Sequence, residues 1–131
     1  MSEPATYLGL DVGQARIGVA RGNTVARLAS PLAVVAVDGQ EVARIKELAD
    51  QENAQGLVVG LPRGLDGQDT EQTELTRRFG RRLDELGLPL HWQDEAGTSV
   101  KAEAEGQDDK LGHDARAAAL ILQDYLDGAD K

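Results

Sequence analysis

The sequence predicts an α/β fold: a mixed five-stranded sheet, three antiparallel strands followed by two parallel ones, with helices on both faces. Two observations predict this class. Short apolar stretches separated by turn residues fill the first third of the chain, which is typical of an antiparallel meander. Apolar residues at helical spacing then alternate with continuous apolar runs, as expected where helices connect parallel strands. The length of 131 residues suits one domain, and we expect residues 1–131 to form it.

Three strands are expected at the start of the chain. Residues 7–12 are apolar and rich in strand formers, and residues 16–20 follow after a turn that contains Gly13. A third extended stretch covers residues 25–37 and is expected to break at Pro31. The short turns between these stretches indicate antiparallel pairing.

A helix and a buried strand are expected next. Asp38 and Glu41, three residues apart, resemble a capping box. The helix should end between residues 53 and 56, and residues 57–60 form the continuous apolar run of a strand buried on both faces. The apolar positions of the helix are Val42, Ile45, Leu48 and Ala49.

The second half of the chain predicts two more helices around one strand. Residues 62–67 read as a loop with two glycines, and residues 90–93 as the strand. Residues 94–112 are polar, with a short helix expected near 100–105, and residues 114–126 form an Ala- and Leu-rich helix. The helix between loop and strand ends at Gly87 and has an apolar stripe of Leu75, Phe79, Leu83 and Leu86.

Composition excludes several classes. Cysteine is absent, so neither a disulfide framework nor a thiolate metal site is possible. The chain has no apolar run near 18 residues and no signal-peptide pattern, so we expect a cytoplasmic protein that does not enter a membrane. With 14 basic and 23 acidic residues the net charge is −9, which argues against binding nucleic acid by bulk charge. It does not exclude a nuclease, because bound divalent metals invert local charge.

Three acidic positions are candidates for chemistry. Asp11 lies inside an apolar strand, where a carboxylate is costly unless it is paired, hydrogen-bonded or bound to metal. Asp94 and Glu95 follow the strand at 90–93, although a solvated loop pair is the commoner fate of such residues. Asp114 lies within about 40° of Ala118, Ile121 and Tyr125 on the helical wheel, so it belongs to the stripe that faces the sheet. A helix-capping role is the alternative.

Acids from a central strand, a strand end and a helix start could converge beyond the carboxyl ends of the strands. Three carboxylates carry about −3, and two divalent cations outweigh that charge, which is the logic of two-metal phosphodiester hydrolysis. Hard oxygen ligands suit Mg²⁺ or Mn²⁺, whereas His91 and His113 are too few and too far apart for a zinc motif.

Other features have both a functional and a plain interpretation. Arg16 and Arg63 lie near the expected cleft, and the loop at residues 62–67 has glycines that permit a close approach to phosphate. Trp92 could stack on a base, but packing as the largest core or edge residue is the commoner role. A basic patch on one helix could contact a nucleic-acid backbone, although ion pairing on a solvated face is the favoured interpretation. That patch consists of Arg77, Arg78, Arg81 and Arg82.

Four motifs in order resemble the YqgF family, whose members are also called RuvX-like or Holliday-junction-resolvase-like. The first covers residues 8–13 and 16–20, the second residues 59–62 with Asp66-Gly67, and the third Asp94-Glu95 with Thr98-Ser99. The fourth is the closing helix, with Asp114-Ala115, Ala117-Ala118 and residues 121–126. Together they span nearly the whole chain, so their combination is far more specific than any one of them.

The resemblance implies an RNase H-like fold and a nuclease for the 5′ end of precursor 16S ribosomal RNA in the bacterial cytoplasm. By motif position, Asp11, Glu95 and Asp114 would be the catalytic, metal-binding acids, with Mg²⁺ or Mn²⁺ as cofactor. We expect Arg16, Arg63, Thr98 and Ser99 to contact the substrate. The partners would be nucleic acid and a ribosome precursor. Kinship to junction resolvases makes branched DNA the rival substrate and leaves a homodimer open.

The chain departs from the family at two places. Ala96 stands where the family usually has Arg directly after the Asp-Glu pair, and the segment before Asp114 is short, with only Lys110 and His113 as basic residues. A non-catalytic binding protein on the same fold is therefore one alternative. An actin-like ATPase is another, because a strand ending in Asp-x-Gly also opens its phosphate loop, but that class normally needs two lobes.

Overall fold

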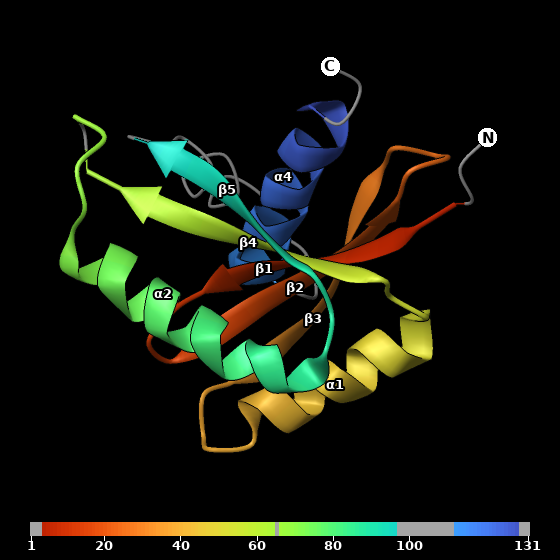
Figure 1. Ribbon diagram of the computed structural model, residues 1–131, viewed down its shortest axis with the longest axis horizontal. Helices are drawn as coiled ribbons and strands as arrows, with labels where there is room; N and C mark the ends of the chain where they lie inside the picture. Colours follow the sequence, from red (N-terminus) through yellow and green to blue (C-terminus); the bar gives the residue numbers. More distant parts are fainter. Residues whose placement is uncertain (1–3, 65, 97–111, 129–131) are drawn as a thin grey trace.

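The computed structural model describes residues 4–64, 66–96 and 112–128 (Figure 1). The order of elements is β1 (Thr6–Val12), β2 (Arg16–Asn23), β3 (Ala29–Ala36), α1 (Glu41–Glu52), β4 (Gly56–Arg63), α2 (Glu71–Arg82), the short 3₁₀ helix η1 (Leu83–Leu86), β5 (Leu90–Ala96) and α4 (Gly112–Gly128). The short helix expected near residues 100–105 lies outside the described residues.

The strands form one five-stranded sheet in the order β3-β2-β1-β4-β5. β1 pairs antiparallel with β2, and β2 pairs antiparallel with β3. β4 lies between β1 and β5 and is parallel to both. This arrangement confirms the predicted mixed sheet. It also places β1 and β4 at the centre, where six consecutive residues of β4, from Gly56 to Leu61, are buried, as the apolar run predicts.

Helices cover both faces of the sheet, as predicted (Figure 1). On one face α1 and α2 pack over large aliphatic side chains, among them Leu10, Ile17 and Val59. On the other face α4 crosses the sheet and buries an alanine-rich stripe together with Val58 and Leu122. Because neighbouring residues of a strand point to opposite faces, each strand contributes alternate residues to these two cores.

The first strands differ from expectation in their length. β2 continues through Gly22 to Asn23, and the third strand begins only at Ala29. Pro31 does not break β3: it pairs with Ala20, while Val19 pairs with Ala33, so Leu32 is the extra residue of a β-bulge. Proline is tolerated there because β3 is the edge strand and a bulge already interrupts its ladder of hydrogen bonds.

The start of α1 is only partly the predicted capping box. Glu41 Oε1 accepts hydrogen bonds from the backbone N–H of Asp38 (3.2 Å) and Gly39 (2.7 Å), as the glutamate of a capping box does. The Asp38 side chain instead accepts from the N–H of Gln40, two residues ahead. Gln40 is the N-cap residue and makes no side-chain cap. The helix ends at Asn53 in the left-handed conformation (φ 54°), within the predicted range.

Two strand ends lie beyond their predicted positions. β4 continues to Arg63, so the loop begins two residues later than expected. β5 continues to Ala96, so Asp94 and Glu95 belong to the strand and do not follow it. Polar residues are tolerated there because β5 is an edge strand. Because side chains alternate between the two faces along a strand, the longer strands fix the faces on which Arg63, Asp94 and Glu95 lie.

None of the helices in the described part of the chain is long and apolar enough to cross a membrane.

Candidate active site

Asp11 lies near the carboxyl end of the central strand β1 and faces α4. Its direct partner in the antiparallel ladder is Gly18 of β2, and directly opposed residues project to the same face of a sheet. Leu10 and Val12, its neighbours, point into the core under α1 and α2. Alternation along the strand therefore places the Asp11 carboxylate on the α4 face.

Asp114 is brought to the same place by a close approach of backbones. A Cβ built on Gly18 would lie 1.8 Å from the carbonyl oxygen of Asp114 and 2.8 Å from the nitrogen of Ala115. The first turn of α4 thus rests directly on β2 at the residue opposite Asp11. The Asp114 side chain is 19 % exposed, in agreement with its predicted position on the sheet-facing stripe. Asp11 and Asp114 therefore lie on one face beside the same glycine.

Glu95 reaches the α4 face from the far edge of the sheet. It pairs with Pro62 of β4. Every second residue of a strand points to the same face, and Val58 and Gly60, which alternate with Pro62 in this way, pack against α4. Glu95 is only 8 % exposed, which is unusual for a carboxylate. Leu10 of β1 pairs with Val59 of β4, so the next residue, Asp11, lies beside Gly60. Because β4 separates β1 from β5, Glu95 lies two strands away from Asp11.

Arg16, one of the predicted substrate-binding residues, lies beside Asp114, one of these three acids. Its Nε donates to Asp114 Oδ2 at 2.8 Å, while 58 % of its side chain remains exposed. The position follows from the turn between β1 and β2, where the N–H of Gly13 donates to the carbonyl of Arg16 at 2.9 Å. A guanidinium therefore supplies positive charge beside Asp114.

The carboxylates of Asp11, Glu95 and Asp114 are the candidate ligands for a divalent metal ion. Carboxylate oxygens are the hard ligands that Mg²⁺ and Mn²⁺ prefer, and Asp11, Glu95 and Asp114 share one face at one end of the sheet. Within residues 4–64, 66–96 and 112–128, however, no three acidic or histidine side chains are gathered closely enough to hold a metal ion. The chemistry of the donors fits a hard cation, and the side chains would have to close around it.

Arg63 lies on the opposite face from these acids. Leu57, Val59 and Leu61 of β4 point toward α1 and α2, and Arg63 continues that alternation. It makes ion pairs with Asp69 and, at 3.2 Å, with Asp94. Sequence reasoning placed Arg63 beside the acids because it ended β4 too early, which left the direction of this side chain undetermined. Thr98 and Ser99 lie outside the described residues.

Two of the four arginines of α2, Arg77 and Arg82, form ion pairs, as the favoured interpretation of the basic patch predicts. Arg77 pairs with Asp69 and Glu74, and these two carboxylates, Asp69 foremost, raise its pKa. Arg82 pairs with the buried Glu41 at 2.9 Å. Among the described residues Arg78 and Arg81 make no ion pair. Trp92 lies on the edge strand β5 and packs against Gly80, which agrees with the predicted packing in the core or at the edge, and it is 42 % exposed.

Sequence reasoning missed the glycine that builds the site. Gly18 was interpreted only as part of an alternating strand. The available signal was glycine repeated inside otherwise apolar strands, which marks positions where another backbone approaches closely. Gly9 and Gly60 show the same use, since a Cβ on either would lie within 2.6 Å of Leu122 or Ile121 of α4.

Known proteins resemble this chain over nearly its whole length. The family model described as "RuvX: Holliday junction resolvase" matches residues 5–128. A protein of Paraburkholderia phytofirmans named "Putative pre-16S rRNA nuclease" is 44 % identical over 132 residues, covering 95 % of this chain and 89 % of its own. A protein of Paraburkholderia phymatum with the same name is also 44 % identical, over 130 residues, with 95 % and 86 % coverage.

Solved structures support the fold. RuvC of Thermus thermophilus superposes with a TM-score of 0.55 at 15 % identity, covering 95 % of this chain and 96 % of RuvC. The same protein in complex with a Holliday junction substrate gives 0.57 at 20 % identity, with 96 % of each chain covered. The predicted RNase H-like fold is therefore confirmed.

Proposed function

The chain belongs to the RuvX family, and from that membership we propose that it is a nuclease that hydrolyses phosphodiester bonds and processes the 5′ end of precursor 16S ribosomal RNA. The observation that carries the proposal is the shared placement of Asp11 and Asp114 beside Gly18, with Glu95 on the same face. Acids from three separate elements repel one another at one end of the sheet, and a bound cation would relieve that repulsion beyond what Arg16 supplies to Asp114.

Each acid has a distinct part in this proposal. Asp11, on the central strand β1, and Asp114, at the start of α4, would hold the cofactor from two sides, and Glu95 would close the site from β5. The cofactor would be Mg²⁺ or Mn²⁺, which when bound supplies the charge that activates water and neutralises the phosphate. Glu95 lies in a nearly water-free environment, where the electrostatic attraction between a carboxylate and a cation is stronger than in bulk water.

Arg16 would contact the substrate from the same face. It is anchored by the turn at Gly13, is more than half exposed, and already supplies a cation beside Asp114. An exposed guanidinium at the rim of an acidic site can bind a phosphate group in two-pronged geometry. We propose that Arg16 holds the phosphate next to the one that is cleaved. Thr98 and Ser99 stay predicted contacts on the motif that carries them.

Branched DNA is the second candidate substrate. Its support is the matching family description and the likeness in fold to RuvC, which has been solved with a Holliday junction. The relatives that are 44 % identical over nearly the whole chain carry the name of a ribosomal RNA nuclease, and this favours RNA. A ribosome precursor in the cytoplasm would then be the partner, and a homodimer belongs to the branched-DNA alternative.

The test is cleavage of labelled single-stranded RNA, single-stranded DNA and a four-way junction, each in Mg²⁺, Mn²⁺ or EDTA. Cleavage of RNA should require metal and should fall at least a thousandfold in Asp11→Asn, Glu95→Gln and Asp114→Asn, on the order expected when a metal site is lost. Asp50→Asn is the matched control, because Asp50 is an exposed acid of α1 that pairs with Lys46 on the surface.

Two outcomes would overturn the proposal. Cleavage that persists in EDTA would exclude metal-dependent chemistry. Binding of RNA without cleavage in any metal would favour a non-catalytic role. Calorimetry separates the site from the activity, because the triple acid variant should no longer bind Mn²⁺ while Asp50→Asn binds it as the wild type does.

A further inference from the structure

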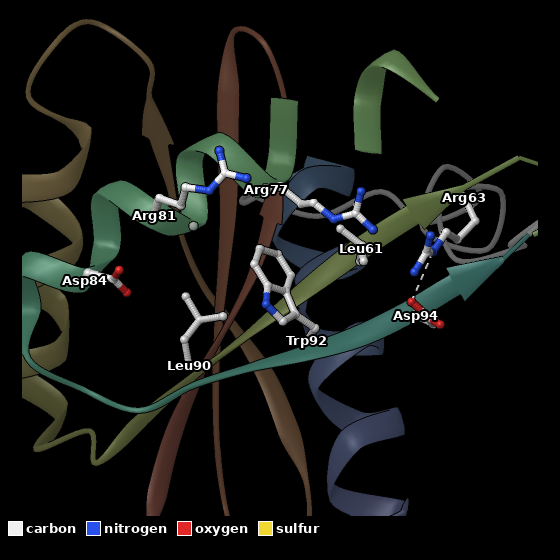
Figure 2. A pocket seen from close by; sticks show the side chains of 9 residues that line it. Leu61, Arg63, Arg77, Arg81, Asp84, Leu90, Trp92 and Asp94 are labelled. Carbon is white, nitrogen blue, oxygen red and sulfur yellow. Dashed lines mark hydrogen bonds and ion pairs between the residues drawn. The ribbon is translucent and has the colours of Figure 1, made fainter. Parts of the chain in front are cut away.

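A groove of about 870 Å³ opens between α2 and the strands β4 and β5. It lies on the face of the sheet that α2 covers, so the sheet separates it from Asp11, Glu95 and Asp114. Figure 2 shows Arg81 and Arg77 projecting from α2, the ring of Trp92 below and between these two, and Arg63 at the end of the groove beside Asp94. The charged residues that line it are Arg63, Arg77, Arg81, Asp84 and Asp94.

Trp92 is presented in this groove by a specific packing arrangement. Gly80 lies in the interior of α2, where glycine costs about 1 kcal/mol of helix stability relative to alanine, and a Cβ there would lie 2.5 Å from the indole ring. The missing side chain lets the ring rest against the helix. Even so, 42 % of the tryptophan stays exposed, which an ordinary core residue would avoid. The ring is therefore held in place with part of its surface open.

The arginines provide cations beside that ring. Arg81, next to Gly80 in the chain, makes no ion pair with any described residue. Arg77 and Arg63 are both held by Asp69, whose pKa is lowered first by its hydrogen bond with Arg77 and further by the charge of Arg63. A shared carboxylate fixes the two guanidinium groups while leaving their other N–H donors to bind a ligand. Arg63 also pairs with Asp94 and Arg77 with Glu74, so carboxylates already neutralise much of the charge of these two arginines, whereas Arg81 has no such partner among the described residues.

We propose that this groove binds a single-stranded segment of the nucleic-acid substrate, with one base stacked on Trp92 and the flanking phosphates on Arg81 and Arg77. An aromatic platform beside cations is how proteins hold single strands without reading their sequence. Asp84, close to Arg81 on the same helical segment, and Asp94, paired with Arg63, would repel phosphate, so the phosphates are expected where Arg81 and Arg77 flank Trp92. The inference rests on the proposed function for the identity of the substrate.

The groove and the acids can be reached by one strand. β5 is the edge of the sheet, and its consecutive residues Asp94 and Glu95 point to opposite faces, the first into the groove and the second toward the acids. A single strand that passes around this edge therefore reaches Trp92 on one face and Glu95 on the other. Such a second contact would hold the substrate beyond the cleaved bond, on a protein whose overall charge repels it.

The test uses the only tryptophan of the chain as its reporter. A short single-stranded oligoribonucleotide is titrated in EDTA, where no cleavage occurs, and the emission of Trp92 is followed. Stacking should quench the emission to a saturating end point, and the binding constant should fall as salt rises. A blunt duplex of the same length should not quench, because its bases are unavailable for stacking.

Variants identify the residues. By fluorescence anisotropy of a labelled oligoribonucleotide, Trp92→Leu and Arg81→Gln should each weaken binding by about tenfold, the size expected from the loss of one stacked base or one charged contact. Lys46→Gln on α1 is the charge-matched control and should change binding less than twofold, as expected for loss of a distant, screened surface charge. Arg81→Lys should recover part of the loss.

Several outcomes would overturn the inference. Absence of quenching would do so, as would equal quenching by the duplex or equal effects of Arg81→Gln and Lys46→Gln. A change in Trp92 emission with protein concentration in the absence of RNA would assign the groove to contact between copies of the chain. Failure of the proposed function would look different: the wild type would show the quenching but would cleave RNA in neither Mg²⁺ nor Mn²⁺. If both proposals hold, the variant with Asp11→Asn, Glu95→Gln and Asp114→Asn should lose cleavage and keep the quenching.

Discussion

The two faces of the sheet are packed in opposite ways. Under α4 the strands carry glycines. The backbone of the helix therefore contacts Gly18 directly, and the Cβ of Leu122 lies against Gly9. Under α1 and α2 the sheet offers large aliphatic side chains such as Leu10 and Ile17, and the helices are held away by them. One face is closed by backbone contact, and the other by filling with side chains.

The difference explains where the two candidate sites lie. Direct backbone contact fixes the first turn of α4 to β2 and leaves Asp114 little freedom relative to Asp11, which suits a site that needs precise placement. On the other face, packing through side chains leaves a groove where α2 passes β5, with Trp92 and Arg81 along it. That arrangement suits a contact that tolerates different bases. Four substitutions, from the largest expected effect to the smallest, test this contrast.

Gly18→Ala should have the largest effect, because the new methyl group would meet the backbone of Asp114 and Ala115, which cannot rotate away. We expect the free energy of unfolding to fall by about 3 kcal/mol or more, measured by urea denaturation. Gly128→Ala at the end of α4 is the control, since no atom of the described residues lies within 4 Å of a Cβ there. Equal stability of the two variants would contradict direct backbone packing on this face.

Glu41→Gln tests the charge that joins α1 to α2. Glu41 is 3 % exposed, and a hydrogen bond from its own backbone N–H, with further ones from Arg82 and Gly39, holds its pKa below the ordinary value of 4.5 against the effect of burial. We expect a loss of about 2 kcal/mol at neutral pH, the scale of a hydrogen bond to a charged group. The measurement is chemical denaturation of the two proteins.

The pH dependence of that difference has a defined sign. Because the folded protein binds the Glu41 proton more weakly than the unfolded chain, this carboxylate stabilises the fold above about pH 4.5, and its contribution is lost as pH falls through the lowered pKa. The gap between wild type and Glu41→Gln should therefore narrow at acid pH. A gap that is constant with pH would contradict the ion pair with Arg82.

Ile45→Val removes one methyl group from the side-chain-filled face. Ile45 is fully buried in the core beneath α1, so we expect a loss of about 1 kcal/mol by thermal or chemical denaturation. Adding a methyl group at Gly18 should thus cost roughly three times as much as removing one here. A larger cost at Ile45 than at Gly18 would reverse the contrast between the faces.

Gly80→Ala should change stability least. Alanine gains about 1 kcal/mol of helix propensity, and that gain is offset because the new methyl group lies 2.5 Å from the half-exposed indole of Trp92, which is able to swing outward. The net change should stay within about 1 kcal/mol. The emission of Trp92 should shift to longer wavelength as the ring moves into water. An unchanged emission would show that Gly80 does not seat the ring.

Much of this fold could be predicted from local patterns. The buried run of β4, the stripe of α2 and the end of α1 at Asn53 follow from spacing and turn residues, because each depends on a few neighbouring positions. The same holds for Asp114, whose place on the sheet-facing stripe of its helix is a matter of periodicity alone. Each of these features is determined by residues of the same element or of the turn beside it.

What could not be predicted depends on distant contacts. The approach of Gly18 to Asp114 joins positions 96 residues apart (114 minus 18), and no local pattern specifies it. The direction of Arg63 depends on two extra residues of β4, and those are set by pairing with β5, since a strand's side chains alternate between faces. Trp92 packs at the edge of the sheet, within the predicted roles, but its half-open position depends on the missing side chain of Gly80, which is on another element.

Pro31 and the bulge at Leu32 bear on how this protein behaves at high concentration. An open edge strand is a template on which a second chain can add by hydrogen bonding, and growth of that kind leads to cross-β aggregates. In β3 one residue of that edge has no N–H to offer, and the extra residue beside it bends the strand out of register for an incoming partner. Replacing Pro31 with threonine would restore a donor to the edge, at the cost of faster aggregation on prolonged warming.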